Sequence, residues 1–193
     1  MRIAFVNSTV RWGGVKSWTL LMASGLAHRG HDLRLFLRPD NPFNDACAAA
    51  GLHVDPLTFG PDWNPLAILR LRHRLGTQGS QVEVTNVSKD NRIAGPAARG
   101  AAVPVLMVVG GPGDLTDRFK IRFEVNRYVD HMVVPSHSVR ESLRRFSWLR
   151  VDEKVTTIHN GVDLGEFRPG QGRGHLRSRI AVPPPASLEV SHS

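Results

Sequence analysis

The chain has 193 residues, 41% hydrophobic and 22% charged, which suits one soluble domain with its own core and excludes a fibrous or globally disordered protein. Its formal net charge of +8 attracts anions such as phosphates, nucleic acids and acidic lipids without selecting among them. The basic residues are not interleaved with aromatic ones, and no helix-turn-helix or zinc-finger spacing occurs, so we expect no nucleic-acid binding. The short apolar runs predict neither a membrane span nor a secretion signal, hence a cytoplasmic protein.

The cysteine and histidine content argues against disulfide and metal chemistry. Cys47 is the single cysteine and sits among alanines, so it reads as a small apolar helix residue. His28, His31 and His53 show no metal-ligand spacing, and no cysteine or carboxylate lies nearby in the sequence to complete a ligand set. We therefore expect no metal site and no bound cofactor.

The opening 37 residues predict a strand, a helix and a second strand. Residues 3–6 form a short apolar run that ends in polar residues, which is typical of a central parallel strand entering a loop. After Gly13 and Gly14, apolar residues recur at helical spacing, namely Val15, Trp18, Met22 and Leu26. Residues 32–37 give the second strand, so this unit predicts a right-handed crossover and a parallel sheet.

The same alternation continues to residue 158. Further helices are predicted at residues 44–50, 66–75, 91–99 and 118–128, and strands at 52–54, 82–87, 103–109, 131–135 and 155–158. One more helix carries Val139, Leu143 and Phe146 on one stripe, and Ser138 with Glu141 predicts a capping box at its start. Such alternation predicts an α/β fold with a doubly wound parallel sheet.

The sequence changes character at its end. Residues 170–193 are rich in glycine and proline, which oppose both helix and internal strand, and they show no core-forming periodicity. We expect one domain over residues 1–169 and a linker or disordered tail over residues 170–193.

The glycine pair between the first strand and the first helix is the most informative local feature. In a doubly wound sheet, ligands bind beyond the carboxyl ends of the strands, where a helix N-terminus presents backbone N–H groups to a phosphate. A flexible turn explains Gly13 and Gly14 equally well. The dinucleotide fingerprint G-x-G-x-x-G is absent between Asn7 and Ser17, which argues against a dehydrogenase or flavodoxin-like domain with a coloured or fluorescent cofactor.

Several segments, taken in order, carry a resemblance to a known family. The glycine pair is followed by LMASGLAHRGHDLRLF, later come VDHMVVPSHSVRESLRRF and KVTTIHNGVDLGEFRP, and together these segments span nearly all of residues 1–169. The sequence resembles the N-terminal, acceptor-side domain of GT-B glycosyltransferases of family 4. The resemblance implies a Rossmann-like domain that is one half of a GT-B enzyme, with the nucleotide sugar held mainly by a second domain that is not seen here.

The resemblance also implies the roles of individual residues. Gly13 and Gly14 would bring N–H groups to the donor phosphates, Trp12 would cover an acceptor sugar, and Gly111 would shape the floor of the cleft. The other expected substrate contacts are Lys89, Asp90, Gly110, Asp114, Asn160 and Gly161. Asp90 and Asp114 are equally read as helix caps. Family members often carry a histidine where Gly110 and Gly111 stand, so no catalytic residue is assigned, which agrees with a retaining mechanism.

Two functions follow as expectations. The first is a retaining glycosyltransferase that moves a hexose from a nucleotide sugar to a glycan or lipid-linked acceptor in cell-surface glycan biosynthesis, inactive without its C-terminal domain. The second is a non-catalytic module that binds a glycan or a membrane surface. The arginines at 70, 72 and 74 bear on the second, because a basic helix of this family can dock onto the anionic inner face of a membrane, although such a run is usually a solvated helix face.

Overall fold

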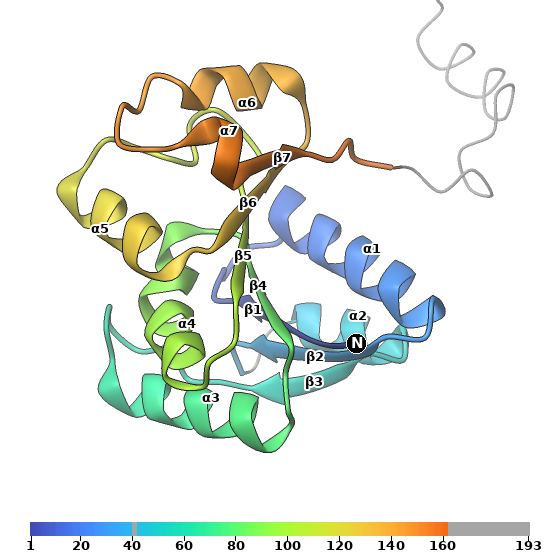
Figure 1. Ribbon diagram of the computed structural model, residues 1–193. Coiled ribbons are helices and arrows are strands. Elements are labelled where there is room, and N and C mark those ends of the chain that lie inside the picture. Colours follow the sequence, from blue (N-terminus) through green and yellow to red (C-terminus); the bar gives the residue numbers. More distant parts are fainter. Residues whose placement is uncertain (40–41, 162–193) are drawn as a thin grey trace, which may run out of the picture. The chain divides into compact units, whose positions relative to one another are not determined.

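The predicted strands pair with one another in a single parallel sheet. A computed structural model describes residues 1–39 and 42–161, and residues 1–159 of it form one compact unit. The sheet has seven strands in the order β3-β2-β1-β4-β5-β6-β7, and every neighbouring pair is parallel (Figure 1). The predicted fold class is confirmed.

The helices and strands follow the expected order. The strands are β1 (Arg2–Asn7), β2 (Asp32–Leu37), β3 (His53–Pro56), β4 (Val82–Thr85), β5 (Val105–Val108), β6 (His131–Val134) and β7 (Val155–Thr157). The helices are α1 (Gly14–His28), α2 (Pro42–Ala49), α3 (Pro65–Thr77), α4 (Ser88–Gly100), α5 (Phe119–Tyr128), α6 (His137–Leu143) and α7 (Val151–Lys154). The expected tail at residues 170–193 lies outside the described residues, and its predicted boundary stays a prediction.

Three local predictions differ from the structure. Helix α4 begins at Ser88 and contains Pro96 in its interior, whereas the sequence suggested a start at residue 91. The cap of α6 is Ser136, whose hydroxyl accepts a hydrogen bond from the amide of Val139, so the capping box predicted at Ser138 is wrong. The single turn of α7 was not predicted, because four residues are too few to show a helical period.

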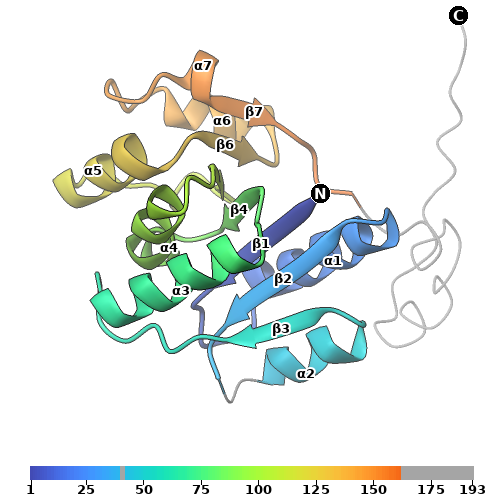
Figure 2. The ribbon, with the colours of Figure 1, turned by 60° about the horizontal axis from the view of Figure 1, so that its bottom comes forward.

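The two faces of the sheet carry different helices. Helices α1 and α2 pack on one face, and the longer series from α3 to α6 packs on the other (Figures 1 and 2). This arrangement follows from right-handed crossovers that run in opposite directions from β1 and from β4. Between β1 and β4 the strand order reverses, which places a topological switch point there.

Helix α1 buries a different stripe from the one predicted. Its fully buried residues are Lys16, Thr19 and Ala23, while the predicted apolar stripe is only partly buried against the sheet. Two polar residues therefore face the switch point, where a purely apolar helix face would be expected.

Two helical glycines differ in what surrounds them, and this difference gives a testable prediction. A Cβ at Gly95 of α4 would lie 2.5 Å from the Cβ of Tyr128, whereas a Cβ at Gly25 of α1 meets nothing within 4 Å. We expect Gly95→Ala to lower the free energy of unfolding by about 1–3 kcal/mol through overpacking. Gly25→Ala, the matched control, is expected to raise it by about 0.5–1 kcal/mol through helix propensity. Urea unfolding of both variants measures the difference, and equal effects would contradict the close α4–α5 packing.

Candidate functional site at the carboxyl edge of the sheet

Polar side chains gather where β1 and β4 end, at the switch point. The hydroxyl oxygen of Thr19 lies 3.2 Å from the side-chain oxygen of Asn86 and accepts a hydrogen bond from the side-chain amide of Asn7 at 3.4 Å. On the other face, Thr85 donates to Asn91 at 2.7 Å. All five residues are buried, so this network joins α1, β1, β4 and α4 beneath the carboxyl edge.

Asp90 fastens the loop after β1 to the start of α4. One carboxylate oxygen accepts the backbone amide of Ser8 at 2.8 Å, and the other accepts the amide of Val87 at 3.3 Å. The side chain is fully buried, and burial raises the pKa of Asp90 to about 6, against the opposing effect of these hydrogen bonds. Asp90 was expected to touch the acceptor or to cap a helix, and in the structure it takes the capping role at α4.

Two cationic side chains bond to backbone carbonyl oxygens of the same loop. Lys16 donates from Nζ to the carbonyl oxygen of Val10 at 2.8 Å, and Arg38 donates from Nε to the carbonyl oxygen of Ser8 at 2.5 Å. The predicted site did not include either residue, because a lysine in a helix and an arginine after a strand look like ordinary surface residues in the sequence.

The glycine pair lies open at this edge. Gly13 is the N-cap of α1 and supplies no side-chain hydrogen bond, and no acidic residue occupies the first turn. A Cβ at Gly13 or Gly14 would meet nothing within 4 Å, so both face open space. Trp12 beside them is 53% exposed, donates to Ser17 and packs edge-on against Phe43 at 5.4 Å. The first-turn N–H groups of α1 can therefore receive an anion.

The loop after β5 closes on itself. The carboxylate of Asp114 accepts the backbone amide of Gly111 at 2.8 Å, and it lies 3.3 Å from the place that a Cβ of Gly110 would take. Asp114 thereby shapes the turn that follows β5, and its expected contact with an acceptor stays a prediction.

The remaining predicted contact residues are Lys89, Asn160 and Gly161. Lys89 is exposed in the first turn of α4, at the same edge. Asn160 and Gly161 follow the compact unit of residues 1–159, so their role stays a prediction. His159, just before them, packs edge-on against His137 at 5.5 Å and bonds to the carbonyl oxygen of Pro135.

A charged network that the sequence did not predict connects α4, α5 and the segment before α3. Glu124 of α5 is buried and accepts hydrogen bonds from Ser88 at 2.5 Å and from Arg92 at 2.7 Å. Asp62, which follows β3, pairs with Arg92 at 2.6 Å and with Lys120 at 2.7 Å, and these cations lower the pKa of Asp62. The network ties the segment before α3 to α4 and α5 and leaves its carboxylates neutralised.

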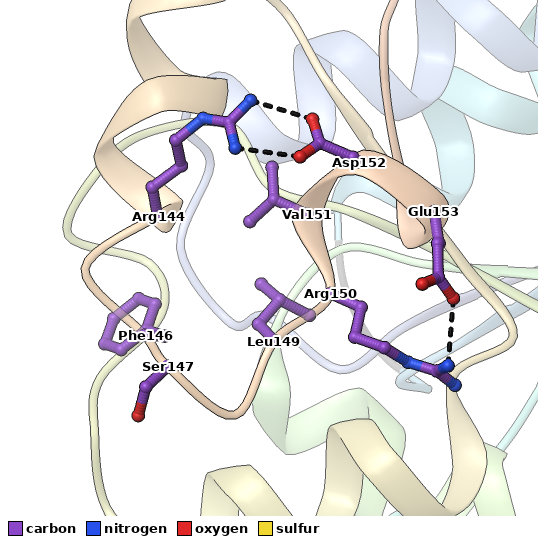
Figure 3. Close-up of a pocket in the computed structure, with 8 residues that line it drawn as sticks. All are labelled: Arg144, Phe146, Ser147, Leu149, Arg150, Val151, Asp152 and Glu153. Atoms are coloured by element: carbon purple, nitrogen blue, oxygen red, sulfur yellow. Dashed lines mark hydrogen bonds and ion pairs between the residues drawn. The ribbon is translucent and has the colours of Figure 1, made fainter.

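A separate hollow lies where α6 meets α7, and Figure 3 shows its lining. Arg144 donates to both oxygens of Asp152, at 2.9 and 2.7 Å, and Arg150 pairs with Glu153 at 2.9 Å. Arg144, followed by Arg140, lowers the pKa of Asp152 to about 2. These residues connect the end of α6 to the start of β7 and so lie at the amino edge of the sheet, away from Gly13 and Gly14. The paired charges indicate a structural role.

Among residues 1–39 and 42–161, no three metal-ligating side chains gather. No helix in these ranges is long and apolar enough to cross a bilayer.

Residues 12–166 match the family described as Glycosyltransferase Family 4. No curated protein sequence matches significantly.

Solved structures share the fold at low sequence identity. HepE of Anabaena, in complex with UDP and glucose, has a TM-score of 0.72 at 16% identity, with 93% of this chain and 50% of that chain covered. A glycosyltransferase of Rickettsia africae gives 0.73 at 16%, with 95% and 50% covered. Sucrose-phosphate synthase of Thermosynechococcus elongatus gives 0.69 at 15%, with 94% and 53% covered. The chain thus spans about half the length of these proteins.

Proposed function

Because the chain belongs to Glycosyltransferase Family 4, we propose that it forms the acceptor-side half of a retaining glycosyltransferase. In this proposal a hexose moves from a nucleotide sugar to a glycan or lipid-linked acceptor in cell-surface glycan biosynthesis in the cytoplasm. A separate C-terminal domain would hold most of the donor. The proposal depends on one observation: Gly13 and Gly14 face open space at the switch point of a family-4 domain.

In this proposal, residues at the carboxyl edge bind either the donor or the acceptor. The N–H groups of Gly13 and Gly14 bind the donor diphosphate at the positive end of α1. Trp12 offers an exposed ring to the face of an acceptor sugar. No side chain serves as general base, and the leaving phosphate oxygen of the donor accepts the proton of the acceptor hydroxyl. HepE, which binds UDP and glucose in its complex, supports a UDP-sugar as the first donor to test.

A substitution at Gly14 tests the proposed function directly. The chain is fused to the C-terminal domain of a family member, and transfer or hydrolysis of UDP-glucose and other nucleotide sugars is followed by UDP release. We expect Gly14→Leu to lower the rate at least about tenfold, because the new side chain points into the space that a phosphate would take.

Gly25→Leu on the same helix is the matched control, since its side chain also meets open space. It should leave the rate of the fusion protein unchanged. A fusion protein that turns over none of the nucleotide sugars, or a Gly14→Leu variant as active as its parent, would count against the proposed function. Turnover by the unfused chain would refute the need for a second domain.

A second candidate function is a module that binds an anionic membrane surface, and the outer face of α5 favours it. Phe119 and Phe123, one turn apart, are 84% and 45% exposed. Arg118 and Arg122 form a parallel stripe beside them, and among the described residues neither has an acidic partner. The one glutamate of α5 is buried, so this face presents cations and aromatic rings without an exposed carboxylate.

One of the three arginines of α3 is engaged within the protein. Arg74 bonds to the carbonyl oxygen of Pro56 and pairs with Asp55 at 3.5 Å, so it faces the protein. Arg70 and Arg72 remain exposed on α3 beside Leu66 and Leu69. We therefore place the membrane contact on α5 rather than on α3.

Vesicle binding tests this second candidate. We expect the chain to float with vesicles that contain anionic phosphatidylglycerol and not with phosphatidylcholine alone. The double variant Phe119→Ser/Phe123→Ser should weaken binding about tenfold or more, since each ring contributes on the order of 1–2 kcal/mol on burial. Leu21→Ser, a control on α1 of the opposite sheet face, is 44% exposed and should bind as the wild type does. Equal binding by all variants would contradict a role for α5.

A further inference from the structure

Lys16 is in an unusual place for a lysine. It lies in the first turn of α1, two residues after Gly14, and is only 1% exposed. The ammonium lies 5.4 Å from the centre of the Phe43 ring, and burial lowers the pKa of Lys16. Lysine is rarely buried unless its charge is compensated, so this position implies that its contacts have a function.

One contact of Lys16 is with the backbone of the glycine loop, defined as residues 8–13. Its Nζ donates to the carbonyl oxygen of Val10 at 2.8 Å. At the start of the same loop, the amide and carbonyl of Ser8 are held by Asp90 and Arg38, at 2.8 and 2.5 Å. Charged side chains from α1, from the end of β2 and from α4 thus fix the first three residues of a loop that carries no regular structure of its own.

This geometry matters for an anion at the loop. Carbonyl oxygens carry partial negative charge and repel a phosphate, whereas N–H groups attract one. When a carbonyl oxygen bonds to a cation, its partial negative charge is compensated and the direction of the carbonyl group is fixed. With the carbonyls of Ser8 and Val10 drawn toward Arg38 and Lys16, the last part of the loop is left to present N–H groups ahead of α1.

We infer that Lys16 is a positioning residue for diphosphate binding: from beneath the glycine loop it fixes the Val10 carbonyl and so orients the N–H groups at Gly13 and Gly14. The ligand class, a nucleoside diphosphate group, rests on the proposed function. The role of Lys16 in ordering the loop does not. Since Lys16 is buried, it acts through the loop and has no direct contact with the phosphate.

Two measurements on the full chain test this inference. Amide hydrogen exchange reports the order of residues 8–13 without any ligand, and NMR shifts of the Gly13 and Gly14 amides report binding of inorganic pyrophosphate. For Lys16→Met we expect exchange in the loop to be about tenfold faster or more, and the Kd for pyrophosphate to rise about tenfold. Lys16→Arg keeps a cationic donor and should recover most of both losses.

The matched control is Lys154→Met, because Lys154 also donates from Nζ to a backbone carbonyl, that of Val129 at 3.0 Å. This variant should leave loop exchange and pyrophosphate binding as in the wild type, even if its melting temperature falls. Unchanged loop exchange in Lys16→Met would overturn the positioning role. If the wild type binds no pyrophosphate but Lys16→Met still loosens the loop, then the proposed phosphate site fails while the role of Lys16 stands.

Discussion

Replacing Asp90 by alanine is expected to lower the free energy of unfolding by about 2–4 kcal/mol, because the buried amide of Ser8 and the partly buried amide of Val87 would both lose their acceptor. Urea unfolding at pH 7 measures the loss. The matched control is Asp114→Ala, which removes an exposed carboxylate that accepts one amide, that of Gly111. We expect the control to cost less than about 1 kcal/mol, and similar costs for the two variants would contradict the buried role of Asp90.

The pH dependence gives a second measure of the same residue. Burial raises the pKa of Asp90 from 3.8 to about 6, so the native state keeps a proton that the unfolded state has lost. The stability that this protonation contributes is present below pH 3.8 and is lost as the pH rises to about 6. Asp90→Asn does not titrate and keeps one oxygen acceptor for the amide of Ser8. Its stability should fall less across this range than that of the wild type, and a slope equal to that of the wild type would contradict the raised pKa.

The sequence predicted the sheet well because apolar periodicity and turn residues determine where strands and helices form. Residues 3–6 are a continuous apolar run and residues 32–37 are mostly apolar, and they became β1 and β2, of which β1 borders the switch point. The position of Gly13 and Gly14 at the carboxyl edge followed from that topology alone. Their exposure, which the structure adds, keeps a phosphate-binding role available to them.

The buried polar residues at the site could not be predicted from the same signals. Lys16, Thr19 and Asn91 are residue types that usually occupy solvated helix faces, so nothing in the sequence distinguishes them from surface residues. Their burial depends on partners far along the chain, as with Thr19 and Asn86. Ser136 and Ser138 are equally good caps by residue type, and only the backbone path after β6 selects Ser136.

Glu83 is a buried acidic residue in the middle of the sheet, and it is the subject of the last prediction. It lies in the central strand β4, fully buried, and neither carboxyl oxygen has a hydrogen-bond partner among the described residues. Burial, with a smaller contribution from the charge of Asp90, raises the pKa of Glu83 well above its ordinary value of 4.5. Native Glu83 therefore keeps its proton, and the associated stability is present below pH 4.5 and declines as the pH rises toward the native pKa.

We expect Glu83→Met, which is close in volume and has no carboxyl group, to raise the free energy of unfolding by about 1–3 kcal/mol at pH 7.5. The gain should grow between pH 5 and pH 8, because the penalty in the wild type grows with pH. Glu153→Met, on an exposed glutamate of α7, is the control and should change stability by less than about 0.5 kcal/mol. Chemical unfolding across this pH range is the measurement, and a loss of stability in Glu83→Met would contradict the cost assigned to the buried, unpaired carboxyl.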